Sequence, residues 1–213
     1  ENKLELIRFG HSNWAIIKKN DMNQSQIVQD LSDIRRNRKH YLWEVFMKKY
    51  KCDYICELGV CKGKNFHQMI KHNPKLAVAI DSWIEDGTIS RNDGRYPQKE
   101  LDEQYENFKN SVQDKPFVRI YREYTFNAVK HFPDHYFDMV YIDADHTYGG
   151  CLKDIQDWFP KVKKGGFLLG DDYRVSEYRV KFGVIEAVND FARKTNVDFL
   201  TLPSYGWAIV KEQ

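Results

Sequence analysis

The sequence contains no long hydrophobic run. None of its 213 residues lies in a stretch that approaches the roughly 20 consecutive apolar residues of a membrane-spanning helix. The amino-terminal residues also lack the pattern of a secretion signal. We therefore expect a soluble, cytoplasmic chain with no membrane partner. It begins with Glu1 instead of Met, so we expect a trimmed chain or a module of a longer polypeptide.

Neither sign of charge is in excess. The chain has 33 Lys and Arg residues against 31 Asp and Glu residues, and its formal net charge is +2. Proteins that bind nucleic acid through its phosphates need a concentrated positive patch, which this balanced distribution does not supply. We therefore expect no nucleic-acid partner.

Cysteine is scarce and its spacing is uninformative. Cys52, Cys56, Cys61 and Cys151 form neither a C-x-x-C pair nor a zinc-binding pattern. Three of them lie in or beside one apolar segment, where free cysteine behaves as a small buried hydrophobic residue. We expect reduced thiols in the core.

The size and the 42% hydrophobic content suit one compact domain. Within it, residues 1–50 are polar and we expect them to form an N-terminal helical extension. Apolar residues recur there at helical spacing from Ile27 to Ile34 and from Tyr41 to Tyr50. Residues 51–213 would form the main domain.

The main domain alternates strand-like and helix-like segments, which indicates βαβ units and a parallel sheet. The strand-like runs are Tyr54–Leu58, Leu76–Ile80, Phe117–Tyr121, Phe137–Ile142 and Phe167–Gly170. The helical segments between them are 62–72, 98–113, 125–131 and 149–163.

The end of the chain departs from this alternation. After a helix at 181–194, two strand-like runs at Asp198–Leu202 and Gly206–Val210 are separated by only three residues. That connection is too short for a crossover helix, so the two runs must pair antiparallel. We therefore expect an α/β fold with a Rossmann-like, doubly wound, mostly parallel seven-stranded sheet, an antiparallel C-terminal hairpin and N-terminal accessory helices.

Acidic side chains follow two neighbouring strands of this pattern. Together with one histidine, they are Asp143, Asp145, His146, Asp171 and Asp172. The carboxyl ends of neighbouring parallel strands open onto one crevice, where ligands bind. Several carboxylates in one place are costly without a cation, and oxygen ligands suit Mg²⁺, Ca²⁺ or Mn²⁺. The alternative is that a residue such as Asp145 only caps the following helix.

A glycine-containing turn follows the first strand of the main domain, from Glu57 to Asn65. Glycines at such a turn let a ligand approach the backbone, and Asp81, about twenty residues on, can accept hydrogen bonds from ribose hydroxyls. These features suit NAD and S-adenosylmethionine alike. Because G-x-G-x-x-G is absent, a pyrophosphate is poorly served, whereas Glu57, Asn65 and the loop amides suit an amino-acid tail.

The combination of E-L-G-x-x-x-G, the acidic end of the second strand, YIDADH and GGFLLGDDY resembles class I S-adenosylmethionine-dependent methyltransferases. It is most similar to the metal-dependent sugar O-methyltransferases of macrolide and aminocoumarin pathways, and more distantly similar to catechol O-methyltransferase. The resemblance covers roughly residues 50–213.

This resemblance implies a site, residue by residue. The cofactor-binding positions are Glu57, Gly59, Gly63 and Asn65 for the methionine part, Asp81 and Ser82 for the ribose, Thr125 for adenine, and Asp143. The metal positions, for a divalent ion such as Mg²⁺, are Asp143, Asp171 and Asp172. The catalytic base falls on either His146 or Asp145, and the sequence leaves that choice open.

The implied activity is metal-assisted methylation of a sugar hydroxyl, for example on a deoxysugar such as rhamnose within a glycan, in association with glycosyltransferase domains. Two polar loops, 84–98 and 173–181, would overhang the site, and Trp83 and Tyr148 would be available to stack on a sugar. The alternatives are a catechol-like small-molecule acceptor, a catalytically silent glycan-binding module, and a different nucleotide-binding enzyme such as a dehydrogenase.

Overall fold

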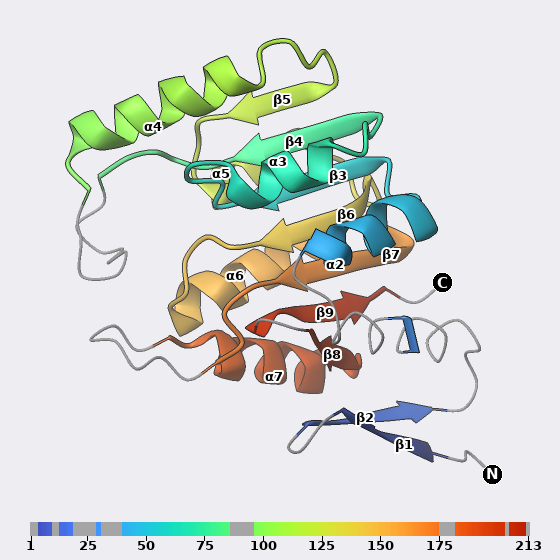
Figure 1. Ribbon diagram of the computed structural model, residues 1–213. Helices are drawn as coiled ribbons and strands as arrows, with labels where there is room; N and C mark the ends of the chain where they lie inside the picture. Colours follow the sequence, from blue (N-terminus) through green and yellow to red (C-terminus); the bar gives the residue numbers. More distant parts are fainter. Residues whose placement is uncertain are drawn as a thin grey trace.

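The computed structural model describes residues 4–9, 13–18, 29–30, 40–85, 96–174, 182–202 and 205–211. Its centre is a seven-stranded sheet in the order β5-β4-β3-β6-β7-β9-β8 (Figure 1). The strands are β3 (Tyr54–Leu58), β4 (Leu76–Ile80), β5 (Val118–Tyr121), β6 (Phe137–Ile142), β7 (Val162–Gly170), β8 (Phe199–Thr201) and β9 (Trp207–Val210).

The strand directions confirm the predicted sheet. Strands β3 to β7 pair with their neighbours in parallel. Strand β9 lies between β7 and β8 and is antiparallel to both. The order reverses beside β3, which makes the carboxyl ends of β3, β4 and β6 the edge at which a doubly wound sheet offers a binding crevice.

Helices cover both faces of the sheet, as the alternating pattern predicts. They are α2 (His40–Glu44), the π-helix η1 (Val45–Lys49), α3 (Lys64–Ile70), α4 (Gln98–Ser111), α5 (Thr125–Ala128), the 3-10 helix η2 (Val129–His131), α6 (Tyr148–Trp158) and α7 (Val184–Thr195). Strand side chains alternate between two cores: Ile55 packs with α2, η1, α3 and α4, while Cys56 packs with α5, α6 and α7. Both cores are apolar, as a parallel sheet covered on two sides requires.

The N-terminal segment differs in part from the expected helical extension. Residues Leu4–Phe9 (β1) and Asn13–Lys18 (β2) form an antiparallel pair with Leu4 opposite Lys18. The sequence LELIRF alternates apolar and charged residues in part, a period of two that favours a strand over a helix. The helix expected from Ile27 to Ile34 lies outside the described residues except for Gln29 and Asp30. The second expected segment, Tyr41–Tyr50, is confirmed as helical by α2 and η1.

Helix α2 and η1 lie against the sheet beside the acidic strand ends. The Trp43 ring meets Tyr141 of β6 edge-on at 4.9 Å, and Phe46 meets Phe167 of β7 at 4.9 Å. These aromatic contacts bury a large apolar area. Across the described residues, no helix combines the length and the hydrophobicity that a membrane crossing requires.

Gly59 marks the tightest contact in the sheet edge. Its φ is +82°, and a Cβ there would lie 2.1 Å from the carbonyl oxygen of Asp143 and 2.6 Å from Cα of Ala144. Only glycine tolerates both the left-handed backbone and this approach of two main chains. The turn after β3 therefore rests directly on the turn after β6.

We predict that Gly59→Ala destabilises the protein by about 2–4 kcal/mol, because it combines a strained backbone with a collision against immovable main chain. Gly149→Ala is the matched control, since a Cβ at Gly149 in α6 meets nothing within 4 Å. That substitution should be neutral or stabilise by about 0.5–1 kcal/mol. Urea unfolding of both variants measures the difference, and equal stabilities would contradict this role of Gly59.

Candidate active site

The site is built on hydrogen bonds that continue the sheet one residue past its strands. They bind each turn to the strand beside it, so the carboxyl ends cannot separate. The bonds are Gly59 N to Ile80 O (2.8 Å), Asp143 N to Leu58 O (2.8 Å) and Asp171 N to Ile142 O (3.1 Å).

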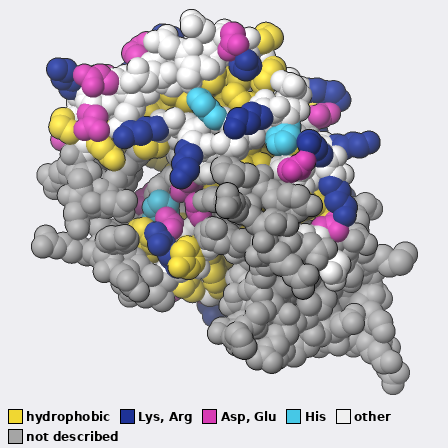
Figure 2. Space-filling view, in the orientation of Figure 1, with side chains coloured by type: hydrophobic (Ala, Val, Ile, Leu, Met, Phe, Trp, Pro, Cys, Tyr) yellow, Lys and Arg dark blue, Asp and Glu magenta, His cyan; other side chains and the backbone are white. Residues whose placement is uncertain are grey.

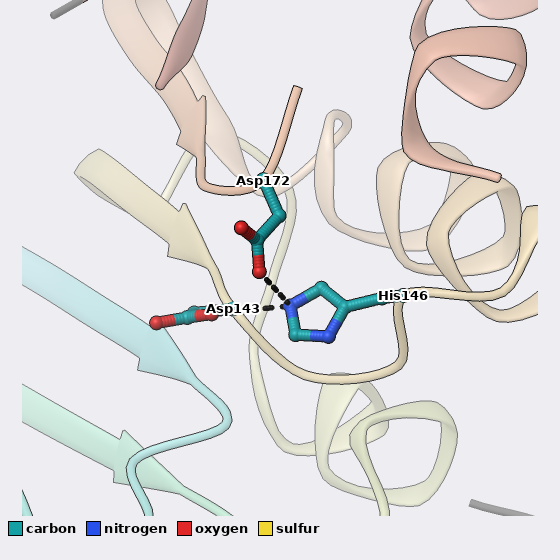
Figure 3. A group of neighbouring side chains, drawn as sticks. All are labelled: Asp143, His146 and Asp172. Atoms are coloured by element: carbon teal, nitrogen blue, oxygen red, sulfur yellow. Dashed lines mark hydrogen bonds and ion pairs between the residues drawn. The ribbon is translucent and has the colours of Figure 1, made fainter. Parts of the chain in front are cut away.

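Three side chains converge at this edge. His146 Nε2 lies 3.3 Å from Asp143 Oδ1 and 3.3 Å from Asp172 Oδ2, and one ligand atom from each of the three residues falls within 4.8 Å of the others. Figure 3 shows the imidazole pointing between the two carboxylates, which come from the turns after β6 and β7. All three side chains keep partial exposure, with 22% for Asp143, 29% for His146 and 18% for Asp172.

The electrostatics follow from crowding acidic groups. Burial raises the pKa of Asp143, and the nearby charges of Asp171 and Asp172 raise it further, while the hydrogen bond to His146 acts in the opposite direction. Burial lowers the pKa of His146, but the hydrogen bond to Asp143 and the surrounding carboxylates outweigh it and the net direction is upward. The cluster therefore favours a positive charge at its centre.

A second cation adjoins the cluster. Arg174 Nε donates to Asp172 Oδ1 at 2.8 Å, and its guanidinium lies over the rings of Tyr205 (5.0 Å) and Phe182 (5.7 Å). Phe182 in turn packs against the ring of His146 at 4.9 Å. Asp172 adopts a left-handed φ of +56°, and its carboxylate contacts both His146 and Arg174.

Asp171 lies next to the cluster but is oriented differently. Its Oδ1 accepts a hydrogen bond from Asp172 N at 3.0 Å. It also bonds the buried Tyr141 hydroxyl, whose pKa rises through burial and the charges of Asp143 and Asp171. Of the predicted metal positions, the structure brings together Asp143 and Asp172 with His146, whereas Asp171 faces Tyr141. The assignment of Asp171 to a metal stays a prediction.

Asp145 faces helix α6. Its Oδ1 accepts from Thr147 N at 2.8 Å, and its carboxylate lies so close to Gly150 that a Cβ there would meet Asp145 Oδ2 at 2.0 Å. The helix cap itself is Thr147, whose side chain accepts from Gly150 N. Asp145 therefore stabilises the start of α6, a role similar to the helix cap considered as the alternative. Of the two candidate bases, His146 is the one that lies within the cluster.

The chemistry of the donors fits a divalent cation. Carboxylate oxygens of Asp143 and Asp172, the ligand type that suits Mg²⁺ or Mn²⁺, converge from two strand ends beside the imidazole of His146. Such an ion would also offset the burial and the neighbouring negative charges that raise the Asp143 pKa.

The predicted cofactor loop adjoins this cluster. Asn65 Nδ2 donates to Asp143 Oδ2 at 3.2 Å, which joins the first turn of α3 to the acidic edge. Glu57 is 1% exposed at the end of β3. Gly63 has φ +78°, and a Cβ there would meet the Phe108 ring at 2.6 Å. The four expected residues around the methionine part thus lie along the end of β3, the turn after it and the start of α3.

The predicted ribose position is linked to the turn after β3. Asp81 Oδ2 accepts from Cys61 N at 2.8 Å, so the ends of β3 and β4 are joined through this carboxylate. Ser82 Oγ accepts from Ile84 N at 3.4 Å. The sequence suggested that Trp83 could stack on a sugar. That expectation is wrong, because the Trp83 side chain is fully buried.

The predicted adenine contact has a partner that the sequence analysis missed. Thr125 Oγ1 donates to Asp154 Oδ1 at 2.5 Å, and Asp154 is only 3% exposed. Burial raises the pKa of Asp154 to about 7. The signal was present, because Asp154 occupies a core-facing position of α6 between Cys151 and Trp158.

The edge is open to solvent. Figure 2 shows a hollow over the ends of β6 and β7 in which a histidine and acidic side chains are visible beside basic ones. Residues 86–95 and 175–181 of the two predicted overhanging loops lie outside the described residues, with Tyr178 and Arg179 among them.

We predict that Asp154 makes stability fall as pH rises. An unfolded aspartate ionises near pH 4, whereas folded Asp154 holds its proton to about pH 7, so the folded state loses relative stability across that window. Asp154→Asn keeps an acceptor for Thr125 but cannot ionise. Relative to the parent, the variant should gain up to about 4 kcal/mol between pH 4 and pH 8. Urea unfolding at the two pH values measures this, and a constant difference would refute it.

Comparisons with known proteins agree with this geometry. The model of a family described as "Methyltransferase domain" matches residues 56–173, from β3 to just past the acidic turn after β7. An uncharacterized protein of Acanthamoeba polyphaga mimivirus is 38% identical over 52 residues, which are 24% of this chain and 23% of that protein. The chain therefore spans only a minor part of the curated relative it matches.

Solved structures share the fold. The O-methyltransferase from Bacillus cereus in complex with SAH has a TM-score of 0.59 at 12% identity, covering 90% of this chain and 92% of that one. The O-methyltransferase NovP has a TM-score of 0.57 at 16% identity, with coverages of 87% and 81%. The O-methyltransferase TomG from Streptomyces achromogenes, in complex with SAM, has a TM-score of 0.57 at 13% identity and coverages of 91% and 91%.

The family match covers more than half of the chain and includes both the glycine turn and the acidic turn. The likeness to the solved O-methyltransferases extends over most of the chain, 87% for NovP and 90% for the Bacillus cereus protein. The chain therefore belongs to the methyltransferase domain family and has the class I S-adenosylmethionine-dependent methyltransferase fold.

Proposed function

We propose that this protein is an S-adenosylmethionine-dependent O-methyltransferase assisted by a divalent cation. The observation that carries the proposal is the convergence of Asp143, His146 and Asp172 within 4.8 Å, next to the glycine turn of a methyltransferase fold. Asn65 links the expected cofactor-binding segment to the acidic cluster, because it belongs to that segment and donates a hydrogen bond to Asp143. The cofactor and the activated hydroxyl would thus meet at one sheet edge.

Asp143 and Asp172 would hold the cation, with Asp171 adjacent and His146 left free to accept a proton. When bound, a divalent ion lowers the pKa of a hydroxyl group that contacts it and fixes that group in place. The residues of the chain supply the rest: the two turns are fixed by main-chain hydrogen bonds, and orientation of two reactants at a rigid edge contributes several kcal/mol to rate.

His146 is the proposed proton acceptor. It lies in the cluster and its ordinary pKa is about 6.5, which suits a base near neutral pH. The Asp145 carboxylate faces Thr147 and Gly150 instead. Asp143 and Asp172 hold the imidazole between them, which orients His146 toward the cluster.

The proposed acceptor is a sugar hydroxyl, for example on a deoxysugar such as rhamnose within a glycan. Polar and aromatic groups at the rim support it. Arg174 and the 57% exposed Tyr205 flank Asp172, and Tyr148, 41% exposed, carries its hydroxyl toward Asp190 at 2.9 Å. Such rims suit a polyhydroxylated ligand with one apolar face better than a flat apolar ring.

We predict that methyl transfer depends on the cation-binding carboxylates. Asp143→Asn or Asp172→Asn should lower kcat by roughly 100-fold or more, because several kcal/mol of charge stabilisation is lost. Chelation of the parent should do the same, and added Mg²⁺ should restore activity. Asp134→Asn is the control, since that exposed carboxylate pairs with Lys161 near the amino ends of β6 and β7, opposite to the site. Full turnover after exhaustive chelation would contradict the metal role.

The acceptor is tested by a methyl-transfer screen with S-adenosylmethionine against glycosides, nucleotide sugars and catechols. We expect methylated glycosides as the main product. Methylation of catechols alone would replace the sugar assignment with a small-molecule acceptor. A thermal-shift comparison accompanies the screen, because a ligand that binds only the folded state raises Tm. S-adenosylmethionine should raise it and NADH should not, and the reverse result would favour a dehydrogenase.

A further inference from the structure

Trp83 holds an unusual backbone conformation beside the predicted ribose site. Its φ is +43° and its side chain is 0% exposed. Large residues other than glycine rarely adopt the left-handed region. Such strain persists only where the surroundings fix it, and it concentrates at ligand-binding sites.

The surroundings fix Trp83 on several sides. Its carbonyl oxygen accepts from Gln98 Nε2 at 3.0 Å and from Arg122 Nη2 at 3.1 Å. Its ring stacks on Phe108 with centroids 5.8 Å apart and packs against Tyr105 at 5.2 Å. Neither the position nor the backbone of Trp83 can change without breaking these contacts.

Trp83, Asp81 and Cys61 close a ring of three hydrogen bonds. Trp83 N donates to Asp81 Oδ1 at 2.9 Å, and Cys61 N donates to Asp81 Oδ2 at 2.8 Å. The Trp83 indole Nε1 then donates to Cys61 O at 3.0 Å. The turn after β3 and the turn after β4 are therefore locked to each other through one indole group, with one carboxylate between them.

We propose that Trp83 is a positioning residue for ribose recognition and acts through Asp81. The inference rests on the proposed binding of S-adenosylmethionine. By holding Cys61, the indole fixes both amides that orient the Asp81 carboxylate. Each carboxylate oxygen can accept more than one hydrogen bond, so the oriented group can still receive the ribose hydroxyls. Preorganisation of this kind increases affinity because less order is lost on binding.

Trp83→Phe tests the lock, because it keeps an aromatic ring and removes the indole donor. Trp158→Phe is the matched control. Trp158 is also fully buried, but it belongs to the opposite core and its indole Nε1 has no hydrogen-bond partner among the described residues. By calorimetric titration with S-adenosylhomocysteine, Trp83→Phe should raise Kd about tenfold, and Trp158→Phe less than about twofold. Both substitutions should lower Tm.

A double-variant cycle separates positioning from a general loss of structure. If Trp83 acts through Asp81, then Trp83→Phe in an Asp81→Ala background should change Kd less than about twofold further. Additive losses would overturn the proposal. If Trp83→Phe does not fold, Gln98→Ala takes its place, since it removes a hydrogen bond to the Trp83 carbonyl, together with those to Glu85 N and Asp102, and leaves the indole in place. It should raise Kd in the parent but not in Asp81→Ala.

These experiments distinguish a failure of the proposed function from a failure of the proposed role of Trp83. A parent protein that fails to bind S-adenosylhomocysteine contradicts the proposed function itself. A parent that binds, with Trp83→Phe binding equally well, leaves that function intact and overturns the role of Trp83. Weakening of the same size in Trp158→Phe also overturns it, because the effect would then come from lost packing.

Discussion

The site depends on the main-chain hydrogen bonds that extend the parallel sheet past its strands. They join Gly59 to β4, Asp143 to β3 and Asp171 to β6. Because each turn is bonded to the neighbouring strand, side chains from three separate turns are held at fixed distances without help from a ligand. Gly59 is required at the centre, where two main chains approach too closely for any Cβ. Preorganisation of this kind is what transferring a group between two bound molecules requires.

This rigidity brings together carboxylates that repel one another. Each carboxylate has different neighbouring groups that offset the repulsion. Asp143 and Asp172 share His146, Asp172 also pairs with Arg174, and Asp171 is bonded by its own turn and Tyr141. These partners stabilise the carboxylates in the absence of a ligand. Asp143, His146 and Asp172 nevertheless keep oxygen and nitrogen atoms that could contact a ligand. The same principle appears at Asp81, whose carboxylate is oriented by two amides.

Much of this could be predicted from sequence. The mostly parallel sheet with its antiparallel end could be predicted from the positions of the strands and from the short final connection. Apolar periodicity locates the strands, and connection length limits which of them can pair in parallel. The N-terminal strands were missed, since the helical spacing from Ile27 onward does not hold for all of residues 1–50, and LELIRF itself alternates in part. In the site, residue types identified Asp143, His146 and Asp172, but not the direction of Asp145 or Asp171. Side-chain directions depend on turn geometry, and the burial of Trp83 depends on packing against Tyr105 and Phe108 of α4, which follow it along the chain.

The most direct test of the central claim is anomalous diffraction from a crystal of the protein soaked with Mn²⁺ and S-adenosylhomocysteine. We predict one strong peak within about 2.2 Å of oxygens from both Asp143 and Asp172, with the cofactor product on the Gly59 turn. Product bound at that turn, with the strong Mn²⁺ peak elsewhere or absent, would contradict a cation site at the convergent strand ends.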